Sequence, residues 1–131
     1  MKKPEFYEND ILFFFGGKPV ELSLYRALFR HMEEEFPDAS VKVQKSQISF
    51  YNRHLFASVS LPVRRKKDWP IQCVVVTIGL PYRLASPRVA AATEPYPNRW
   101  THHVLVSEES QVDGELLGWQ REAYDFSESK R

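Results

Sequence analysis

The sequence has a single cysteine and no long apolar run, and each shortage excludes a class of protein. One cysteine, Cys73, cannot form an internal disulfide, which fits the reducing cytoplasm. The apolar run nearest the start covers only residues 11–15, which is too short for the core of a signal peptide. No stretch reaches the roughly 20 apolar residues of a membrane-spanning helix. We therefore expect a soluble, cytoplasmic protein without a membrane segment.

The sequence also lacks the common signatures of catalysis. It has no G-x-S-x-G serine motif, and Gly16-Gly17 lacks the spacing of a phosphate-binding loop. Acidic residues are scarce between positions 41 and 103, where only Asp68 and Glu94 occur. This scarcity removes the paired carboxylates that glycosidases and two-metal nucleases need. The sequence predicts no catalytic residue and no cofactor, and we do not expect an enzyme.

Two adjacent histidines, His102 and His103, are the nearest approach to a metal-binding motif. Adjacent residues of a strand point to opposite faces of the sheet, so one ion can hardly bind both. No H-x-x-x-H motif or Cys/His cluster completes a site. We predict no metal site, with a hydrogen-bonded His102 in the core and a more exposed His103.

The residues that are present indicate one compact domain. The chain has 131 residues, of which 43% are hydrophobic and 14% aromatic, enough to bury a core without disulfides or metal. We expect a single domain over residues 1–131, with its core at about 11–126. Residues 1–10 and 127–131 are expected to be flexible ends.

Residues 41–61 predict three short strands in succession. Apolar residues lie at the odd positions Val41 and Val43 and then at the even positions Ile48 and Phe50. One strand cannot change parity, because its side chains alternate strictly between the two faces, so the chain must turn or bulge between them. A second turn is expected at Asn52, because asparagine tolerates the left-handed backbone conformation.

The two expected helices have apolar residues at helical spacing, and the remaining segments read as strands or loops. Consecutive strands joined by short turns favour an α+β two-layer sandwich, an antiparallel sheet of four to six strands with both helices on one face. The other expected elements are an extended segment at 11–15, a helix at 20–36, strands at 71–80 and 100–106, an irregular segment at 81–99, and a helix at 110–126 capped by Ser110 or Asp113.

Charge is unevenly distributed, although the net charge is only +1. Residues 41–103 carry 10 Lys and Arg against 2 Asp and Glu, whereas both flanking regions are acidic. A local positive field of this kind predicts an anion-binding surface on the sheet. The alternative is that each base pairs with a helix carboxylate and the surface is inert. The candidate ligand-binding residues are Lys45, Tyr51, Arg53, Arg83, Arg88 and His103.

A basic loop supports a second interpretation. Residues 64–69 combine four consecutive cations with an aromatic residue, a composition suited to phosphate contacts but also common in solvated loops. The primary hypothesis is a binding module for a small anionic ligand or a protein partner, with a pocket between the sheet and residues 81–99. The alternative is a nucleic-acid-binding accessory domain that uses Arg64, Arg65, Lys66, Lys67 and Trp69.

Seven motifs follow one another along residues 14–124: FFGGKP, LYRAL, VQKSQISF, FASV, SPR, RWTHH and VDGELLGWQREAY. Together they resemble a bacterial family, the domain-of-unknown-function family 5655, and more distantly the small YdhG-type and frataxin-like domains. The resemblance implies a helix, a curved antiparallel sheet and a closing helix, and it implies no particular activity. The matching positions are Gly16, Gly17, Pro19, Tyr25, Lys45, Ser46, Phe50, Phe56, Pro87, Arg88, His102, His103, Trp119 and Tyr124.

Overall fold

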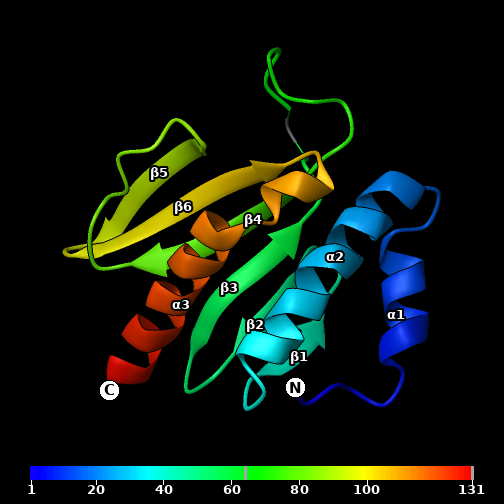
Figure 1. Cartoon of the computed structure of the whole chain (residues 1–131), viewed down its shortest axis with the longest axis horizontal. Helices are drawn as coiled ribbons and strands as arrows, with labels where there is room; N and C mark the ends of the chain where they lie inside the picture. Colours follow the sequence, from blue (N-terminus) through cyan, green and yellow to red (C-terminus); the bar gives the residue numbers. More distant parts are fainter. Residues whose placement is uncertain (64, 131) are drawn as a thin grey trace.

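The protein is an α+β sandwich in which helices cover one face of an open antiparallel sheet, as predicted (Figure 1). The structure is a computed structural model that describes residues 1–63 and 65–130. The sheet has six strands in the order β1-β2-β3-β4-β6-β5. Its elements are α1 (Tyr7–Phe14), α2 (Pro19–Glu35), β1 (Ser40–Val43), β2 (Ile48–Tyr51), β3 (Leu55–Ser60), β4 (Val74–Leu80), β5 (Val89–Tyr96), β6 (Arg99–Val106), the 3₁₀ helix η1 (Glu109–Gln111) and α3 (Gly114–Ser129).

The three strands predicted within residues 41–61 are confirmed as β1, β2 and β3. The parity change marks a hairpin, because the amide of Gln44 donates to the carbonyl of Gln47 across 2.9 Å. In the resulting register Val41 lies opposite Phe50, and both side chains are buried on the helical side. Alternation of apolar residues was therefore sufficient to locate this reversal.

Asn52 makes the turn between β2 and β3 by a different mechanism from the one expected. Among the described non-glycine residues only Asn98 has a positive φ, so Asn52 is not left-handed. Its side chain instead donates to the carbonyl of Tyr124 at 2.8 Å and accepts from the hydroxyl of Ser127 at 2.6 Å. Asn52 thus ties the turn to the last turns of α3.

The expectation of an extended segment at residues 11–15 was wrong, because these residues continue and end helix α1. Tyr7, Ile11 and Phe15 recur every four residues and are buried, whereas Phe13 is 90% exposed. A short run of consecutive apolar residues has no periodicity of its own, so it does not distinguish a strand from a helix.

The ends of the chain, expected to be flexible, make defined contacts in this structure. Lys2 forms a parallel bridge with Ser40 beside β1, and Tyr7 is buried. Ser127 is also buried, in the last turn of α3.

Residues 81–99, expected to be irregular, contain the edge strand β5. β5 pairs only with β6 through a turn in which Asn98 has φ 61°. Pro95 is tolerated there because an edge strand needs fewer backbone donors than a central one. The strand predicted at 71–80 begins later, at Val74, and lies between β3 and β6 in the sheet.

The two long helices lie side by side over the sheet (Figure 1). α2 buries Leu24, Leu28 and Met32, which recur every four residues along the helix. Asp113, one of the two expected caps, caps the start of α3, because its carboxylate accepts from the amide of Leu116 at 3.0 Å. This arrangement leaves the basic loop between β3 and β4 projecting beyond the two layers.

Candidate functional site

Lys45, Arg53 and Arg88, three bases of the candidate ligand-binding set, lie in three separate places. Lys45 is in the β1–β2 hairpin, and Arg53 is at the opposite end of β2, in the turn to β3. Arg88 precedes β5, which β3, β4 and β6 separate from β2. The structure therefore does not bring these side chains to one surface, because Lys45 and Arg53 lie at opposite ends of β2 and the order of the strands places Arg88 at the other edge of the sheet.

The other candidate ligand-binding residues have partners of their own. The ammonium group of Lys42 lies 4.9 Å from the centroid of the Tyr51 ring, and the guanidinium of Arg83 lies 5.7 Å from that of Trp100. His103 shares a hydrogen bond of 2.8 Å between its Nδ1 and Oγ1 of Thr77.

Arg88 is held by acceptors at the start of α3. Its Nη1 donates to Asp113 at 2.9 Å and to Glu115 at 3.0 Å, and its Nη2 donates to the carbonyl of Gln111 at 2.7 Å. The Leu116 amide, and then the Arg88 guanidinium, hold the pKa of the Asp113 carboxyl below its usual range. Arg88 therefore pairs with carboxylates at the start of α3, as the alternative to an anion-binding surface predicts.

A hollow beneath the basic loop brings together residues from both sequence-based hypotheses. This loop hollow has a volume of about 540 Å³ and lies between the loop, the start of β5 and the end of β6. Arg88 belongs to the candidate ligand set, whereas Lys66 and Trp69 belong to the nucleic-acid set. Arg65 and Lys67 are exposed on the same loop, and Arg64 lies outside the described residues. The lining residues with polar or aromatic side chains are Lys66, Asp68, Trp69, Arg88, Ser107 and Gln111.

Hydrogen-bond donors outnumber acceptors among the side chains that line this hollow. Oε1 of Gln111 accepts from the amides of Ser107 and Glu108, which leaves its amino group as the part that donates elsewhere. A guanidinium has five N–H groups, and the three acceptors at α3 use three of those of Arg88. Together with the ammonium of Lys66, these donors suit an anionic or oxygen-rich group.

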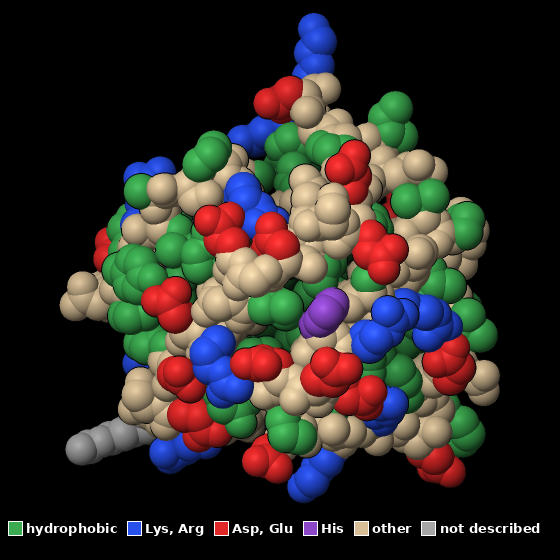
Figure 2. Space-filling view, viewed as in Figure 1, with side chains coloured by type: hydrophobic (Ala, Val, Ile, Leu, Met, Phe, Trp, Pro, Cys, Tyr) green, Lys and Arg blue, Asp and Glu red, His purple; other side chains and the backbone are tan. Residues whose placement is uncertain are grey.

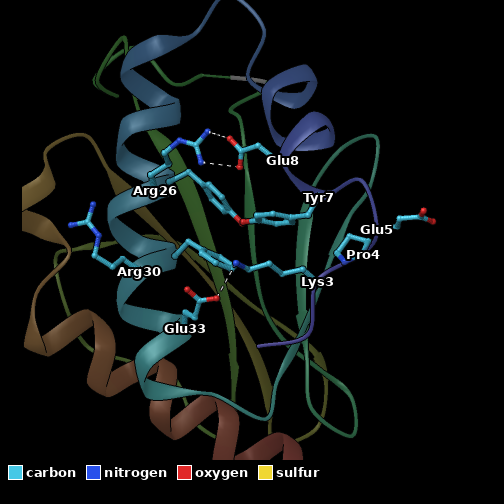
Figure 3. Close-up of a pocket in the computed structure, with 10 residues that line it drawn as sticks. Lys3, Pro4, Glu5, Tyr7, Glu8, Arg26, Arg30 and Glu33 are labelled. Atoms are coloured by element: carbon cyan, nitrogen blue, oxygen red, sulfur yellow. Dashed lines mark hydrogen bonds and ion pairs between the residues drawn. The ribbon is translucent and has the colours of Figure 1, made fainter.

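A second hollow, at the N-terminal end of the chain, was not anticipated from the sequence (Figure 3). This N-terminal hollow has a volume of about 530 Å³ and lies between the segment leading into α1 and one face of α2. The hydroxyls of Tyr7 and Tyr25 share a hydrogen bond of 2.7 Å at its base. Burial raises the pKa of Tyr7 to about 12 and that of Tyr25 further above its usual range.

Ion pairs flank the tyrosines on both sides, as Figure 3 shows. Arg26 binds Glu8 through two hydrogen bonds, and Lys3 lies 3.0 Å from Glu33. The residues contributed by the N-terminal segment were missed because that segment was expected to be flexible. The four-residue spacing of Tyr7, Ile11 and Phe15 was the available signal.

The two histidines have the expected placement. His102 is fully buried, and its Nε2 accepts from the amide of Leu84 at 2.9 Å. His103 is half-buried on the other face, beside Thr77. Within residues 1–63 and 65–130, no three His, Cys, Asp or Glu side chains are grouped as metal ligands would be. None of the helices described is both long enough and apolar enough to cross a membrane.

Comparison with known proteins relates the chain to one family. No curated protein and no solved structure is significantly similar to it. The model of the family described as "Domain of unknown function (DUF5655)" matches residues 13–127, which include the whole sheet, α2 and most of α3. This match covers most of the chain and agrees with the resemblance carried by its motifs. The chain therefore belongs to the DUF5655 family of domains of unknown function.

Proposed function

We propose that this protein is a small binding module that holds an anionic ligand in the loop hollow. The observation that carries the proposal is that Lys66 and Trp69 of the basic loop line the same hollow of about 540 Å³ as Arg88 and Ser107. A cation, an aromatic ring and several neutral donors at one concave place are the usual composition of a small-molecule site.

The basic, aromatic and neutral donor groups of the hollow have distinct roles in the proposed site. Asp113 and Glu115 already pair with Arg88, and the carboxylate of Asp68 also lines the hollow, so Lys66 is the cation that attracts the ligand. The ring of Trp69 offers an apolar face on which a planar part of the ligand packs. The hydroxyl of Ser107 and the amino group of Gln111 supply directional hydrogen bonds. The ligand we expect is accordingly an anion with a flat or apolar portion, such as a nucleotide or an aromatic carboxylate.

A thermal-shift screen tests the proposal with inorganic phosphate, mononucleotides and aromatic carboxylates as probes. A ligand that binds only the folded protein at about 100 times its Kd stabilises it by about 2.7 kcal/mol. We expect at least one anion to stabilise the wild type and Lys45→Ala, and Lys66→Ala to bind it about tenfold more weakly, or 1.4 kcal/mol. Lys45→Ala is the matched control, because it removes the same charge from the distant β1–β2 hairpin. The proposal fails if no anion stabilises the wild type, or if both variants respond alike.

Nucleic-acid binding is the second candidate, and the position of the basic loop favours it. The loop projects beyond the sheet and the helices, and in the space-filling view basic atoms project at its tip with an acidic side chain beside them (Figures 1 and 2). Arg65, Lys66 and Lys67 are all exposed there. Exposed cations at one projecting tip are able to contact several phosphates at once.

Salt dependence separates the two candidates. Phosphate contacts release counterions, so the affinity for an oligonucleotide would fall steeply between about 50 and about 200 mM salt. Replacing Arg65 and Lys67 with glutamine would reduce that slope and leave the binding of a small anion largely intact. A weak salt dependence with retained anion binding would exclude the nucleic-acid interpretation.

A further inference from the structure

The N-terminal hollow holds one of the protein's own ammonium groups against aromatic rings. Nζ of Lys3 lies 5.5 Å from the ring centroid of Tyr7 and 5.3 Å from that of Phe29. The same nitrogen lies 3.0 Å from a carboxylate oxygen of Glu33. In Figure 3 the Lys3 side chain extends across the hollow and ends beside Glu33.

Two rings and a carboxylate around one nitrogen form the kind of site that recognises organic ammonium ions. A cation within about 6 Å of a ring centroid is attracted by the negative face of the ring. The carboxylate adds a charge-assisted hydrogen bond for a primary ammonium, or an ion pair for a methylated one. The contacts of Lys3 therefore identify the chemistry that this part of the hollow accepts.

The aromatic rings are more deeply buried than the Lys3 side chain that lies against them. The rings of Tyr7 and Phe29 are 8% exposed and belong to the hydrophobic core. The Lys3 and Glu33 side chains are each 41% exposed. Lys3 can therefore rotate into solvent without disturbing the core, and the rings stay in place to receive another cation.

The charge of the hollow favours a cation once Lys3 leaves. Three bases and three carboxylates line it, so their formal charges cancel while Lys3 is in place. Arg26 is already paired with Glu8. Removing the Lys3 ammonium leaves a net charge of −1 beside the rings, which attracts cations and repels anions. The six charged lining residues are Lys3, Glu5, Glu8, Arg26, Arg30 and Glu33.

We propose that the N-terminal hollow binds an organic ammonium ion, primary or methylated, which takes the place of the Lys3 side chain. Lys3 acts as an internal occupant that lowers the apparent affinity for the ligand. The hollow shares no lining residue with the loop hollow, so this site and the proposed anion site stand or fall separately.

Chemical rescue of Lys3→Ala tests the site, with n-butylammonium and tetramethylammonium chloride as probes. Either cation should raise the Tm of Lys3→Ala in a saturable way, whereas equal concentrations of sodium chloride should not. Binding to the wild type should be about tenfold weaker if Lys3 occupies the site about nine-tenths of the time. Lys2→Ala, which removes the neighbouring charge, should behave as the wild type does.

Two further variants decide whether the rings and the carboxylate form the site. Glu33→Gln and Phe29→Leu, each combined with Lys3→Ala, should weaken or abolish the rescue, and circular dichroism verifies that each variant is folded. The proposal is overturned if neither cation stabilises Lys3→Ala. It is also overturned if the stabilisation persists unchanged in both double variants.

The source of the ammonium group is resolved by a second set of probes. Peptides that contain lysine or trimethyllysine are compared with the free amines on Lys3→Ala and the wild type by NMR titration. Tighter binding of the peptides would assign the site to a lysine of a partner protein, and equal binding would assign it to a small amine. Peptide binding that is insensitive to Glu33→Gln would contradict the site.

Discussion

His102 and His103 are neighbours in the chain, and both surroundings disfavour a charged imidazole. Burial is the largest influence on His102 and lowers the pKa of its imidazole. The backbone of Ile78 raises this pKa in part, and the electrostatic effects of Arg83 and His103 lower it further. Burial alone lowers the pKa of His103. At neutral pH the folded protein therefore holds both imidazole rings in the neutral form.

The stability of the protein should depend on these two protonations. The unfolded chain binds protons near the ordinary histidine pKa of 6.5, whereas the folded chain binds them only at lower pH. The contribution of the two neutral histidines to the free energy of unfolding is fully present above pH 6.5. It is lost as the pH falls through the pKa values that the two rings have in the folded protein. We expect the free energy of unfolding, measured with urea, to fall between about pH 7 and pH 5, by at most about 1.4 kcal/mol per pH unit for each histidine.

His103→Gln provides the control for this prediction. His103 is half-buried, so the variant should fold and show a shallower pH dependence than the wild type. Equal slopes in the two proteins would show that His103 does not contribute.

Arg88 shows how far a single residue can be interpreted from sequence. Its place in a proline-rich segment suggested a ligand contact, but its acceptors are Asp113, Glu115 and the carbonyl of Gln111. These acceptors lie 23 to 27 residues further along the chain. No local pattern relates positions so far apart, so only the folded chain identifies the pairs.

At the scale of elements, α3 has a different buried face from the one its apolar residues indicate. Leu116 and Ala123 of α3 are buried, as is Val112 just before the helix, whereas Trp119 is half-buried beneath Arg88. The polar residues Gln120 and Ser127 complete the buried face. Nε2 of Gln120 donates to the sulfur of Met32 at 3.5 Å and the hydroxyl of Ser127 donates to Asn52, whereas Oε1 of Gln120 is buried without a hydrogen-bond partner among the described residues.

The different burial of Leu116 and Trp119 predicts which of two substitutions in α3 lowers the free energy of unfolding more. Leu116 is fully buried, so Leu116→Ala should lower the free energy of unfolding by about 2–5 kcal/mol. Trp119→Ala should cost less, about 1–2 kcal/mol, because Trp119 packs against the margin of the core and is only partly buried. Urea unfolding of both variants measures the difference. A larger loss for Trp119→Ala would mean that the indole, and not Leu116, anchors α3.

The molecule as a whole mixes charges that the sequence separates into acidic and basic regions. Figure 2 shows acidic and basic side chains close together over the helical face. Three of the ion pairs lie within the helical layer and its N-terminal segment: Lys3 with Glu33, Arg26 with Glu8, and Arg121 with Glu35. Regional net charge consequently identifies the projecting loop but not a continuous basic surface.

The N-terminal segment should be part of the cooperative fold, although the family match begins only at residue 13. Deleting residues 1–12 removes the buried side chains of Tyr7 and Ile11 from the core. Each contributes about 1.5–3 kcal/mol, so we expect a loss of about 3–6 kcal/mol in unfolding free energy. Urea unfolding compares the shortened chain with full-length Phe13→Ala, which removes a 90% exposed ring and should be near neutral. Equal stability of the shortened and full-length chains would contradict this.

The sequence by itself determined the strands of the meander, the two long helices and the α+β sandwich. These features depend on the spacing of apolar residues along a few turns or strands, because side chains alternate in a strand and recur every three to four residues in a helix. The reversal between Val43 and Ile48 is the clearest case. Periodicity was less informative for residues 11–15, where consecutive apolar residues show no repeat, and for the edge strand β5, none of whose residues is fully buried.

Only the tertiary structure decided which chemical groups meet. The strand order β4-β6-β5 places Arg88 beside α3 and far from Lys45, and the packing of α1 on α2 joins Tyr7 to Tyr25. Such pairs depend on elements that are distant in the chain and are brought together by burial of a common core. The sequence therefore determined where the layers lie, and the packing of those layers decided which side chains line each hollow.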